Sequence, residues 1–184
     1  KNQFALISYV ATRTAGDPAL SQRAIAKGTG KALGTVNGLV KQLDTMGYLD
    51  GANRITDAGL AALAPYKVDN AVIMAAGMSS RFAPLSYEKP KALLKVKGEV
   101  LIEREIRQLQ AAGIDYITIV VGYMKEKLFY LEDRFHVKIV INEDYYRYNN
   151  PSTLMLVRDR LKNTFICSSD NYFEENPFEP YVYQ

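Results

Sequence analysis

A run of small residues, one arginine and one lysine follow a short apolar segment that ends near residue 74, and these residue types can bind phosphate groups. The segment 70–74 is typical of a buried strand, and Gly77 just behind it allows a sharp turn of the chain. Backbone N–H groups in such a turn point at a bound anion. Arg81 can donate paired hydrogen bonds to phosphate oxygens, and Lys91 can supply a mobile positive charge. The pattern therefore predicts a loop that holds a triphosphate.

The spacing of this loop excludes two common phosphate-binding motifs. It is not a Walker P-loop, because no Gly-Lys-Ser/Thr closes it, and it lacks the G-x-G-x-x-G pattern. An Ala-Ala-Gly tripeptide alone is more often an ordinary turn after a strand. The longer pattern, A-A-G-x-x-x-R-x-x-P with E-K-P-K-A-L downstream, is much more specific.

At these residues the chain resembles the nucleotidyltransferases that join an NTP to a phosphorylated small molecule and release pyrophosphate. Within that family it is similar to the bacterial CTP:phosphocholine cytidylyltransferases. The resemblance runs from about residue 70 to the end of the chain, through the blocks 74–77, 81–85, 89–93, 120–123, 148–154 and 169–172. One departure is Ser79, where the family often has a second glycine that lets the backbone approach the phosphates more freely.

The resemblance implies a site made of cations, hydrogen-bond donors and one metal ligand. Arg81 would neutralise the β and γ phosphates, and Lys91 would bridge the α-phosphate and the incoming phosphate. Asp170 would bind Mg²⁺, the implied cofactor, which prefers oxygen ligands and phosphates. Tyr172 would lie near the acceptor, because aromatic rings attract quaternary ammonium groups. The residues implied to bind the nucleotide are Ala75, Ala76, Gly77, Met78, Ser79, Ser80, Gly122, Tyr123, Asn149, Asn150 and Ser152, the last of which can equally cap the following helix.

The segment 67–184 alternates strand and helix patterns, which indicates an α/β fold. Strands are expected at 71–75, 116–121, 137–141 and 164–167, and helices at 101–112, 125–135 and 152–161. This alternation predicts a Rossmann-like, mostly parallel, doubly wound sheet, whose ligands bind beyond the carboxyl ends of the strands. Relatives have a second carboxylate further along the chain, so the segment is expected to be the N-terminal part of the nucleotidyltransferase domain.

The segment 1–66 has a different pattern and is expected to be a separate domain. Helices are expected at 4–14, 22–27, 35–46 and 57–64, with Ser21 and Asp57 as N-caps, Gly47 as a helix end and a hairpin at 48–56. This order resembles a winged helix-turn-helix domain of the MarR-like kind. The resemblance implies that Lys31, Thr35, Asn37 and Lys41 face DNA and that Arg54 lies on the wing.

The charge distribution leaves the partner of segment 1–66 open. The formal net charge of +3 lies entirely there, where seven Lys and Arg face four Asp. That excess is modest for a DNA-binding domain, and many winged helices serve only as protein-contact or dimer modules. DNA and a second copy of the chain both remain candidate partners.

The overall composition excludes several classes of protein. The content of 48% hydrophobic and 23% charged residues is that of a globular chain, and no apolar run approaches the roughly 20 residues of a membrane helix. We therefore expect a cytoplasmic protein without membrane partners. The single cysteine, Cys167, excludes a disulfide scaffold or a cysteine-rich zinc site and is interpreted as a small buried hydrophobe. His136 lies away from every motif and is interpreted as structural.

Three functions are compatible with these patterns. The first is Mg²⁺-dependent transfer of CMP from CTP to phosphocholine, or to a similar amino-alcohol phosphate. The second is a sugar-1-phosphate nucleotidyltransferase, although such enzymes usually have the second glycine and a Gly-Thr-Ala block. The third is a winged-helix transcriptional regulator that only senses the nucleotide, a role that would not need Arg81, Lys91 and Asp170 together.

Overall fold

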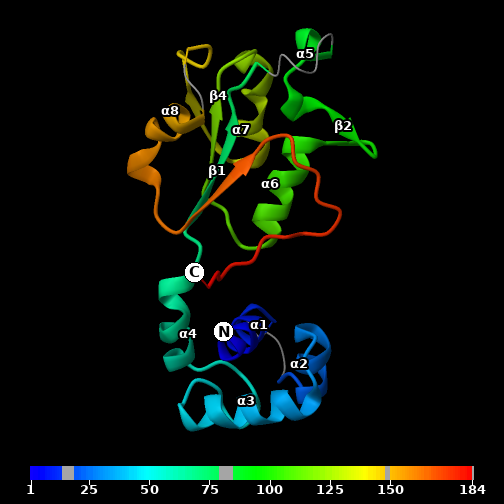
Figure 1. Cartoon of the computed structure of the whole chain (residues 1–184), viewed down its shortest axis with the longest axis vertical. Helices are drawn as coiled ribbons and strands as arrows, with labels where there is room; N and C mark the ends of the chain where they lie inside the picture. Colours follow the sequence, from blue (N-terminus) through cyan, green and yellow to red (C-terminus); the bar gives the residue numbers. More distant parts are fainter. Residues whose placement is uncertain (14–18, 79–84, 148–149, 184) are drawn as a thin grey trace. The chain divides into compact units, whose positions relative to one another are not determined.

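Two compact units make up the chain in the computed structural model, which describes residues 1–13, 19–78, 85–147 and 150–183 (Figure 1). The first unit is Lys1–Lys67 together with Tyr181–Gln184, and the second is Val68–Pro180. The chain therefore passes between the units twice. The sequence-based division into 1–66 and 67–184 did not foresee this return of the last residues to the first unit.

The first unit is a cluster of short helices around a small apolar core. Its helices are α1 (Asn2–Arg13), α2 (Gln22–Thr29), α3 (Leu33–Thr45), α4 (Asp57–Leu63) and the 3-10 turn η1 (Ala64–Tyr66). Helix α1 contacts α2, α3 and α4. Leu6, Val10, Ile25 and Val36 are fully buried between them. The four α-helices lie where the sequence predicted them, and the assignment to the winged helix-turn-helix class remains a prediction.

Local hydrogen bonds explain where these helices begin and end. The Ser21 hydroxyl accepts a hydrogen bond from the N–H of Ala24 at 3.2 Å, which confirms Ser21 as an N-cap. Gly47 follows α3 with φ of 73°, a backbone conformation that favours glycine. The expectation that Asp57 caps α4 was wrong, because the hydroxyl of Thr56 accepts the hydrogen bond from the N–H of Gly59. Asp57 is instead the first residue of the helix.

The predicted hairpin of the first unit is reduced to a single antiparallel bridge between Leu49 and Ile55. The carboxylate of Asp50 closes the turn between them by accepting hydrogen bonds from the N–H groups of Ala52 and Arg54, at 2.9 and 2.8 Å. The Arg54 side chain bonds the same carboxylate at 2.8 Å. The turn is thus organised around one aspartate.

The last residues of the chain complete the first unit through an aromatic cluster. The ring of Tyr183 stacks on that of Tyr66 with centroids 5.6 Å apart, and Phe4 contacts both rings. Lys67 and Tyr181 form an antiparallel bridge beside the cluster. These contacts hold residues 181–183 to the first unit.

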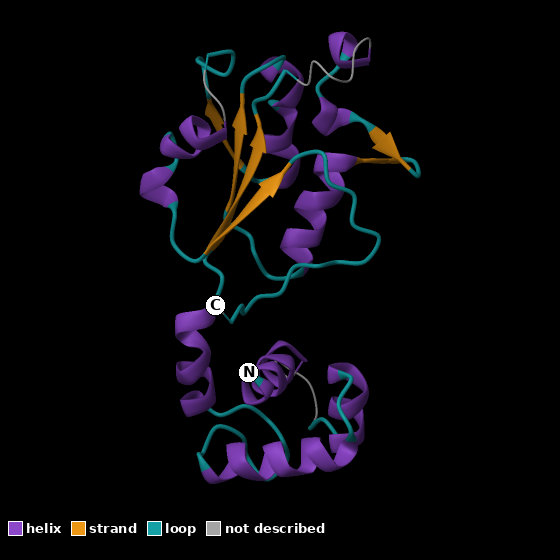
Figure 2. Cartoon of the chain, viewed as in Figure 1, coloured by secondary structure: helices purple, strands orange, loops and turns teal. Residues whose placement is uncertain are grey.

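A four-stranded parallel sheet forms the centre of the second unit (Figure 2). Its strands are β1 (Asn70–Ala75), β4 (Ile117–Val121), β5 (Lys138–Ile141) and β6 (Thr164–Ser168), in the order β5-β4-β1-β6. All three pairings are parallel, which confirms the predicted α/β fold with a parallel sheet. Every residue of β4 is buried, as expected of a strand that is covered on both faces.

Helices pack on both faces of this sheet. They are α6 (Leu101–Ala111) and α7 (Tyr130–Phe135) on one face and α8 (Asn150–Met155) on the other (Figure 1). On the α8 side, Leu154 and Val157 pack against Val72 and Val120. After β5 the chain crosses back to place β6 beside β1, so the strand order reverses at β1. Ligands of such sheets bind at the carboxyl ends of the strands near this reversal.

Several elements of the second unit differ from the sequence-based expectation. The expected helix 125–135 is divided into a 3-10 turn, η4 (Lys125–Leu128), and α7, and the expected helix 152–161 is α8 followed by η5 (Arg158–Arg160). Three short elements were not foreseen: α5 (Leu85–Glu88), η3 (Lys91–Leu93) and a hairpin of β2 (Lys95–Val96) and β3 (Glu99–Val100). The hairpin turns at Lys97 and Gly98, both with positive φ, which is the pattern of a type I′ hairpin turn.

Among the helices in the described part of the chain, none has the length and apolar character needed to cross a membrane.

Candidate functional site

Lys91 and Asp170 meet at the carboxyl end of the sheet, although they are 79 positions apart in the sequence. Lys91 begins the turn η3, and Asp170 follows strand β6. The Nζ atom of Lys91 lies 3.2 Å from Oδ2 of Asp170, with 17% and 37% of the two side chains exposed. The parallel pairing of β1 with β6 places the carboxyl ends of the two strands side by side. The structure thus brings together two residues that the sequence singled out separately.

Asp170 is held as an anion by its neighbours. The hydroxyl of Ser168 donates a hydrogen bond of 2.6 Å to Oδ1 of Asp170. This bond, followed by the contact with the Lys91 ammonium, lowers the pKa of Asp170 below its ordinary value. The N–H of Ser169 bonds the carbonyl of Met74 at 3.3 Å and ties the turn to the end of β1. The site therefore presents an ionised carboxylate and an ammonium next to each other.

The loops after β1 and β4 also converge at this end of the sheet. The N–H of Tyr123 donates a hydrogen bond of 3.1 Å to the carbonyl of Ala76. A Cβ atom on Gly122 would lie 2.9 Å from that carbonyl oxygen and 2.7 Å from Cβ of Tyr145, so the close approach requires glycine. Ala75 and Ala76 are buried, whereas Gly77 and Met78 are exposed beyond them. The exposed backbone at 77–78 can therefore face a ligand.

Tyrosines cluster where β4 and β5 end. The rings of Tyr123 and Tyr145 have centroids 6.4 Å apart, and those of Tyr145 and Tyr146 are 5.7 Å apart. Behind them the buried side chain of Asn142 donates a hydrogen bond of 3.0 Å to the hydroxyl of Thr153. This bond fixes α8 to the end of β5.

Helix α8 contains two of the residues implied to bind the nucleotide. Asn150 is its first residue, and Ser152 lies within it. The alternative that Ser152 caps this helix was therefore wrong, because a cap must precede the first turn. Four other expected site residues lie outside the described residues: Arg81, Ser79, Ser80 and Asn149. Their roles remain predictions.

The ring of Tyr172 already makes cation–π contacts with two side chains of the protein. The guanidinium carbon of Arg104 lies 4.9 Å from the ring centroid, and Nζ of Lys97 lies 5.7 Å from it. A cationic acceptor that approached the same ring would meet these positive charges. The role of Tyr172 in acceptor binding remains a prediction.

Glu105 is a buried carboxyl that the sequence reasoning missed. It is 1% exposed, and neither of its oxygens has a hydrogen-bond partner among the described residues. Burial, and secondly the negative charge of Asp170, raises the pKa of Glu105 to about 8. The helical spacing could have revealed its burial, because Glu105 lies three residues after Ile102 and four before Leu109, on the buried face of α6.

The donor set at this end of the sheet fits Mg²⁺. Within the described ranges, no group of three or more His, Cys, Asp or Glu side chains could enclose a metal. Mg²⁺ needs no such cage, because it keeps several waters and binds through one or two carboxylates and substrate phosphates. Asp170 is ionised, part exposed and at the point where the loops converge, so it can be that carboxylate.

The second unit is thus an open parallel α/β sheet with a small-residue loop and an ion pair at the strand-order reversal, where sheets of this kind bind their ligands. The MobA-like NTP transferase domain family matches residues 71–171. The chain belongs to this family, and its second unit contains a nucleotidyltransferase domain.

Individual relatives agree with this assignment. A choline-phosphate cytidylyltransferase from Streptococcus pneumoniae is 42% identical over 108 residues, covering 59% of this chain and 47% of the relative. A 2-aminoethylphosphonate cytidylyltransferase from Lancefieldella rimae is 42% identical over 115 residues, covering 60% of this chain and 47% of the relative. The solved structure of the CTP:phosphocholine cytidylyltransferase from Streptococcus pneumoniae has a TM-score of 0.59 at 41% identity, covering 60% of this chain and 49% of that chain. The chain thus spans about half the length of these relatives.

Proposed function

We propose that the chain provides the nucleotide-binding part of a Mg²⁺-dependent cytidylyltransferase. It would transfer CMP from CTP to phosphocholine, or to a similar amino-alkyl phosphate or phosphonate, and release pyrophosphate. The observation that carries the proposal is the Lys91–Asp170 pair, 3.2 Å apart at the end of the sheet where nucleotides bind. The relatives named for choline phosphate and 2-aminoethylphosphonate support the choice of CTP and acceptor.

The reaction requires control of charge more than a protein nucleophile. An oxygen of the acceptor phosphate attacks the α-phosphorus of CTP in line, the bond from that phosphorus to the bridging oxygen breaks, and pyrophosphate leaves. Lys91 would hold the α-phosphate and the incoming phosphate together and offset the negative charge that gathers between them. The ion pair with Asp170 keeps the Lys91 ammonium at this end of the sheet before the substrates bind.

The remaining groups would bind the triphosphate. The exposed backbone at 77–78 can donate N–H groups to phosphate oxygens, and Arg81 would add a second cation. Asp170 would hold Mg²⁺, which when bound neutralises part of the triphosphate charge. Ser168, by its hydrogen bond to Asp170, keeps that carboxylate oriented and ionised.

The test is a substrate panel on the full-length protein, with pyrophosphate release as the measurement. Each NTP is supplied with phosphocholine, phosphoethanolamine, 2-aminoethylphosphonate or a sugar 1-phosphate, with and without Mg²⁺. We expect release only with CTP, Mg²⁺ and an amino-alkyl acceptor. Release with UTP or dTTP and a sugar phosphate would contradict the proposal, and tight CTP binding without turnover would favour a nucleotide sensor.

We also propose that the first unit binds DNA through α3. Thr35, Asn37 and Lys41 are exposed on this helix, and polar and basic side chains on one exposed helix can enter a major groove. Two other candidate residues are already engaged within the unit. Lys31 donates a hydrogen bond of 3.1 Å to Asn2, and Arg54 pairs with Asp50 at 2.8 Å. Lys41 is therefore the basic residue on which we expect binding to depend most.

Binding of duplex DNA from upstream of the coding region tests this second proposal by fluorescence anisotropy across a salt series. The affinity of the unsubstituted protein should fall steeply with salt, and Lys41→Gln should weaken binding and reduce the log–log salt slope by about 1. Lys162→Gln, an exposed lysine in the second unit, is the matched control and should change neither. If the protein binds no DNA even at about 50 mM salt, the first unit is a protein-contact module instead.

A further inference from the structure

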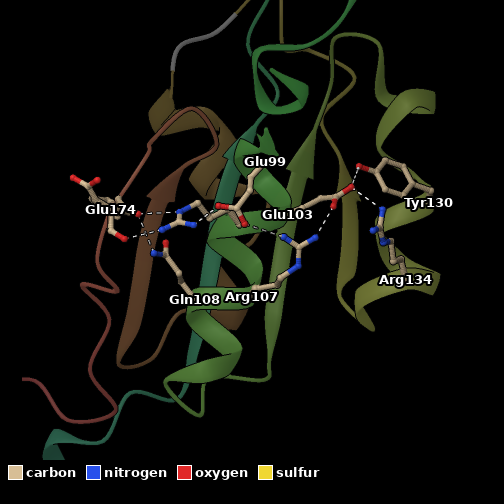
Figure 3. A network of polar contacts seen from close by, with 9 residues as sticks. Glu99, Glu103, Arg107, Gln108, Tyr130, Arg134 and Glu174 are labelled. Carbon is tan, nitrogen blue, oxygen red and sulfur yellow. Dashed lines mark hydrogen bonds and ion pairs between the residues drawn. The ribbon is translucent and has the colours of Figure 1, made fainter. Parts of the chain in front are cut away.

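Helix α6 holds the segment that follows Asp170. The guanidinium of Arg104 donates two hydrogen bonds to backbone carbonyls of this segment, from Nε to Phe173 at 3.0 Å and from Nη2 to Glu174 at 2.8 Å. One helical turn further on, Gln108 donates to the same Phe173 carbonyl at 3.1 Å. Figure 3 shows Glu174 on this segment beside α6, with the side chain of Gln108 pointing toward it. We call residues 171–176 the strap.

Further contacts attach the C-terminal half of the strap to α6 and to the β2–β3 hairpin. The side chain of Asn176 donates a hydrogen bond of 2.7 Å to the carbonyl of Gln108, and Glu174 pairs with Lys97 of the hairpin turn at 2.7 Å. Phe178, just beyond the strap, packs against the rings of Phe165 and Phe173. Residues 173–178 are thus anchored to α6, the β2–β3 hairpin and strand β6.

Arg104 is the residue on which these contacts converge. Its guanidinium also bonds the carboxylate of Glu99 on β3 and lies 4.9 Å from the ring centroid of Tyr172. One planar group therefore contacts the hairpin, two carbonyls and a ring of the strap. A lysine could not reproduce this, because its single ammonium cannot donate in a fixed fork.

On the side of strand β6, Asp170 is held by hydrogen bonds of its own turn. The turn that holds it is tied to β1 through Ser169, and its carboxylate receives the hydrogen bond from Ser168. On the other side only Asn171 and Tyr172 lie between it and Phe173, whose carbonyl Arg104 fixes. Displacement of the strap would therefore move Asp170 relative to Lys91, and a misplacement of about 1 Å can cost 10²-fold in rate.

We propose that Arg104 is a positioning residue for nucleotidyl transfer, which fixes the strap and thereby sets where Asp170 lies beside Lys91. The proposal rests on the proposed function, since it assigns Asp170 to the metal. In this role Arg104 acts through the strap and not by contact with the substrates. Its loss should weaken the binding of the divalent cation and slow the chemical step, with little effect on the binding of CTP without metal.

The experiment compares Arg104→Met and Arg104→Lys with Arg107→Met in the full-length protein. Arg107 is the matched control, because it lies on the same helix and pairs with Glu103 at 2.8 Å and with Glu99, not with the strap (Figure 3). Binding of Mn²⁺ in the presence of CTP is measured by electron paramagnetic resonance, independently of turnover. We expect roughly 10-fold weaker Mn²⁺ binding and about 10- to 100-fold lower kcat for both Arg104 variants, and neither change for Arg107→Met.

The outcomes separate the inference from the function on which it rests. If the unsubstituted protein binds no Mn²⁺ with CTP, both are overturned. If it does, but Arg104→Met binds Mn²⁺ as tightly as Arg107→Met, Arg104 is merely structural and the inference alone fails. Circular dichroism and thermal melts confirm that the variants compared are folded.

Discussion

Replacement of Lys91 by methionine is expected to lower kcat/KM for nucleotidyl transfer about 10²- to 10³-fold, since one preorganised donor contributes roughly 3 kcal/mol to transition-state stabilisation. The Lys91 side chain is 17% exposed, and methionine keeps much of its apolar stem while removing the charge. Most of the loss should appear in kcat, because the charge between the two phosphates is largest in the transition state.

Matched variants distinguish this effect from damage to the fold. Lys89→Met removes a neighbouring positive charge two residues away and should retain activity within a few-fold. The Lys91–Asp170 pair is part exposed, so Lys91→Met should unfold within a few degrees of the unsubstituted protein. A Lys91 variant with normal turnover in the pyrophosphate assay would remove Lys91 from the mechanism.

The strands of the second unit could be predicted from sequence because each is a short apolar run between polar residues. Their pairing could not. Strand β1 pairs with β6 across more than 90 residues, starting from Asn70 opposite Thr164, and nothing local in either segment encodes that partner. The family resemblance named Lys91 and Asp170 in advance, and the doubly wound rule placed the carboxyl ends of β1 and β6 at one edge of the sheet.

The parts of the site that were missed depend on contacts between distant segments. Arg104 looks like an ordinary charged residue of an amphipathic helix, and only the path of the strap shows what it holds. The β2–β3 hairpin was missed for a different reason, because two-residue strands are too short to show alternation. Glu105 could have been found, since its position between two isoleucines of the buried face was visible.

Glu105 predicts an unusual dependence of stability on pH. Its pKa is 4.5 as an ordinary glutamate and about 8 in the folded protein. Between these values the unfolded chain has lost the proton while the folded chain keeps it, so rising pH favours unfolding. This contribution to stability is fully present below about pH 4.5 and is lost progressively up to about pH 8. Each pKa unit is worth about 1.4 kcal/mol, so the loss amounts to a few kcal/mol.

Glu105→Gln should remove this dependence, because glutamine fills the same buried position without a titrating proton. We expect the variant and the unsubstituted protein to have similar stability at pH 5, and the variant to unfold about 5 to 10 °C higher at pH 8. Glu175→Gln, at an exposed position of the same unit, is the control and should leave the difference between the two pH values unchanged. The measurement is thermal unfolding in matched buffers from pH 5 to 8. A stability gap between the Glu105 variant and the unsubstituted protein that did not widen with pH would mean that Glu105 is already ionised in the folded protein. Its negative charge would then act together with that of Asp170 and strengthen the attraction of this site for a cation.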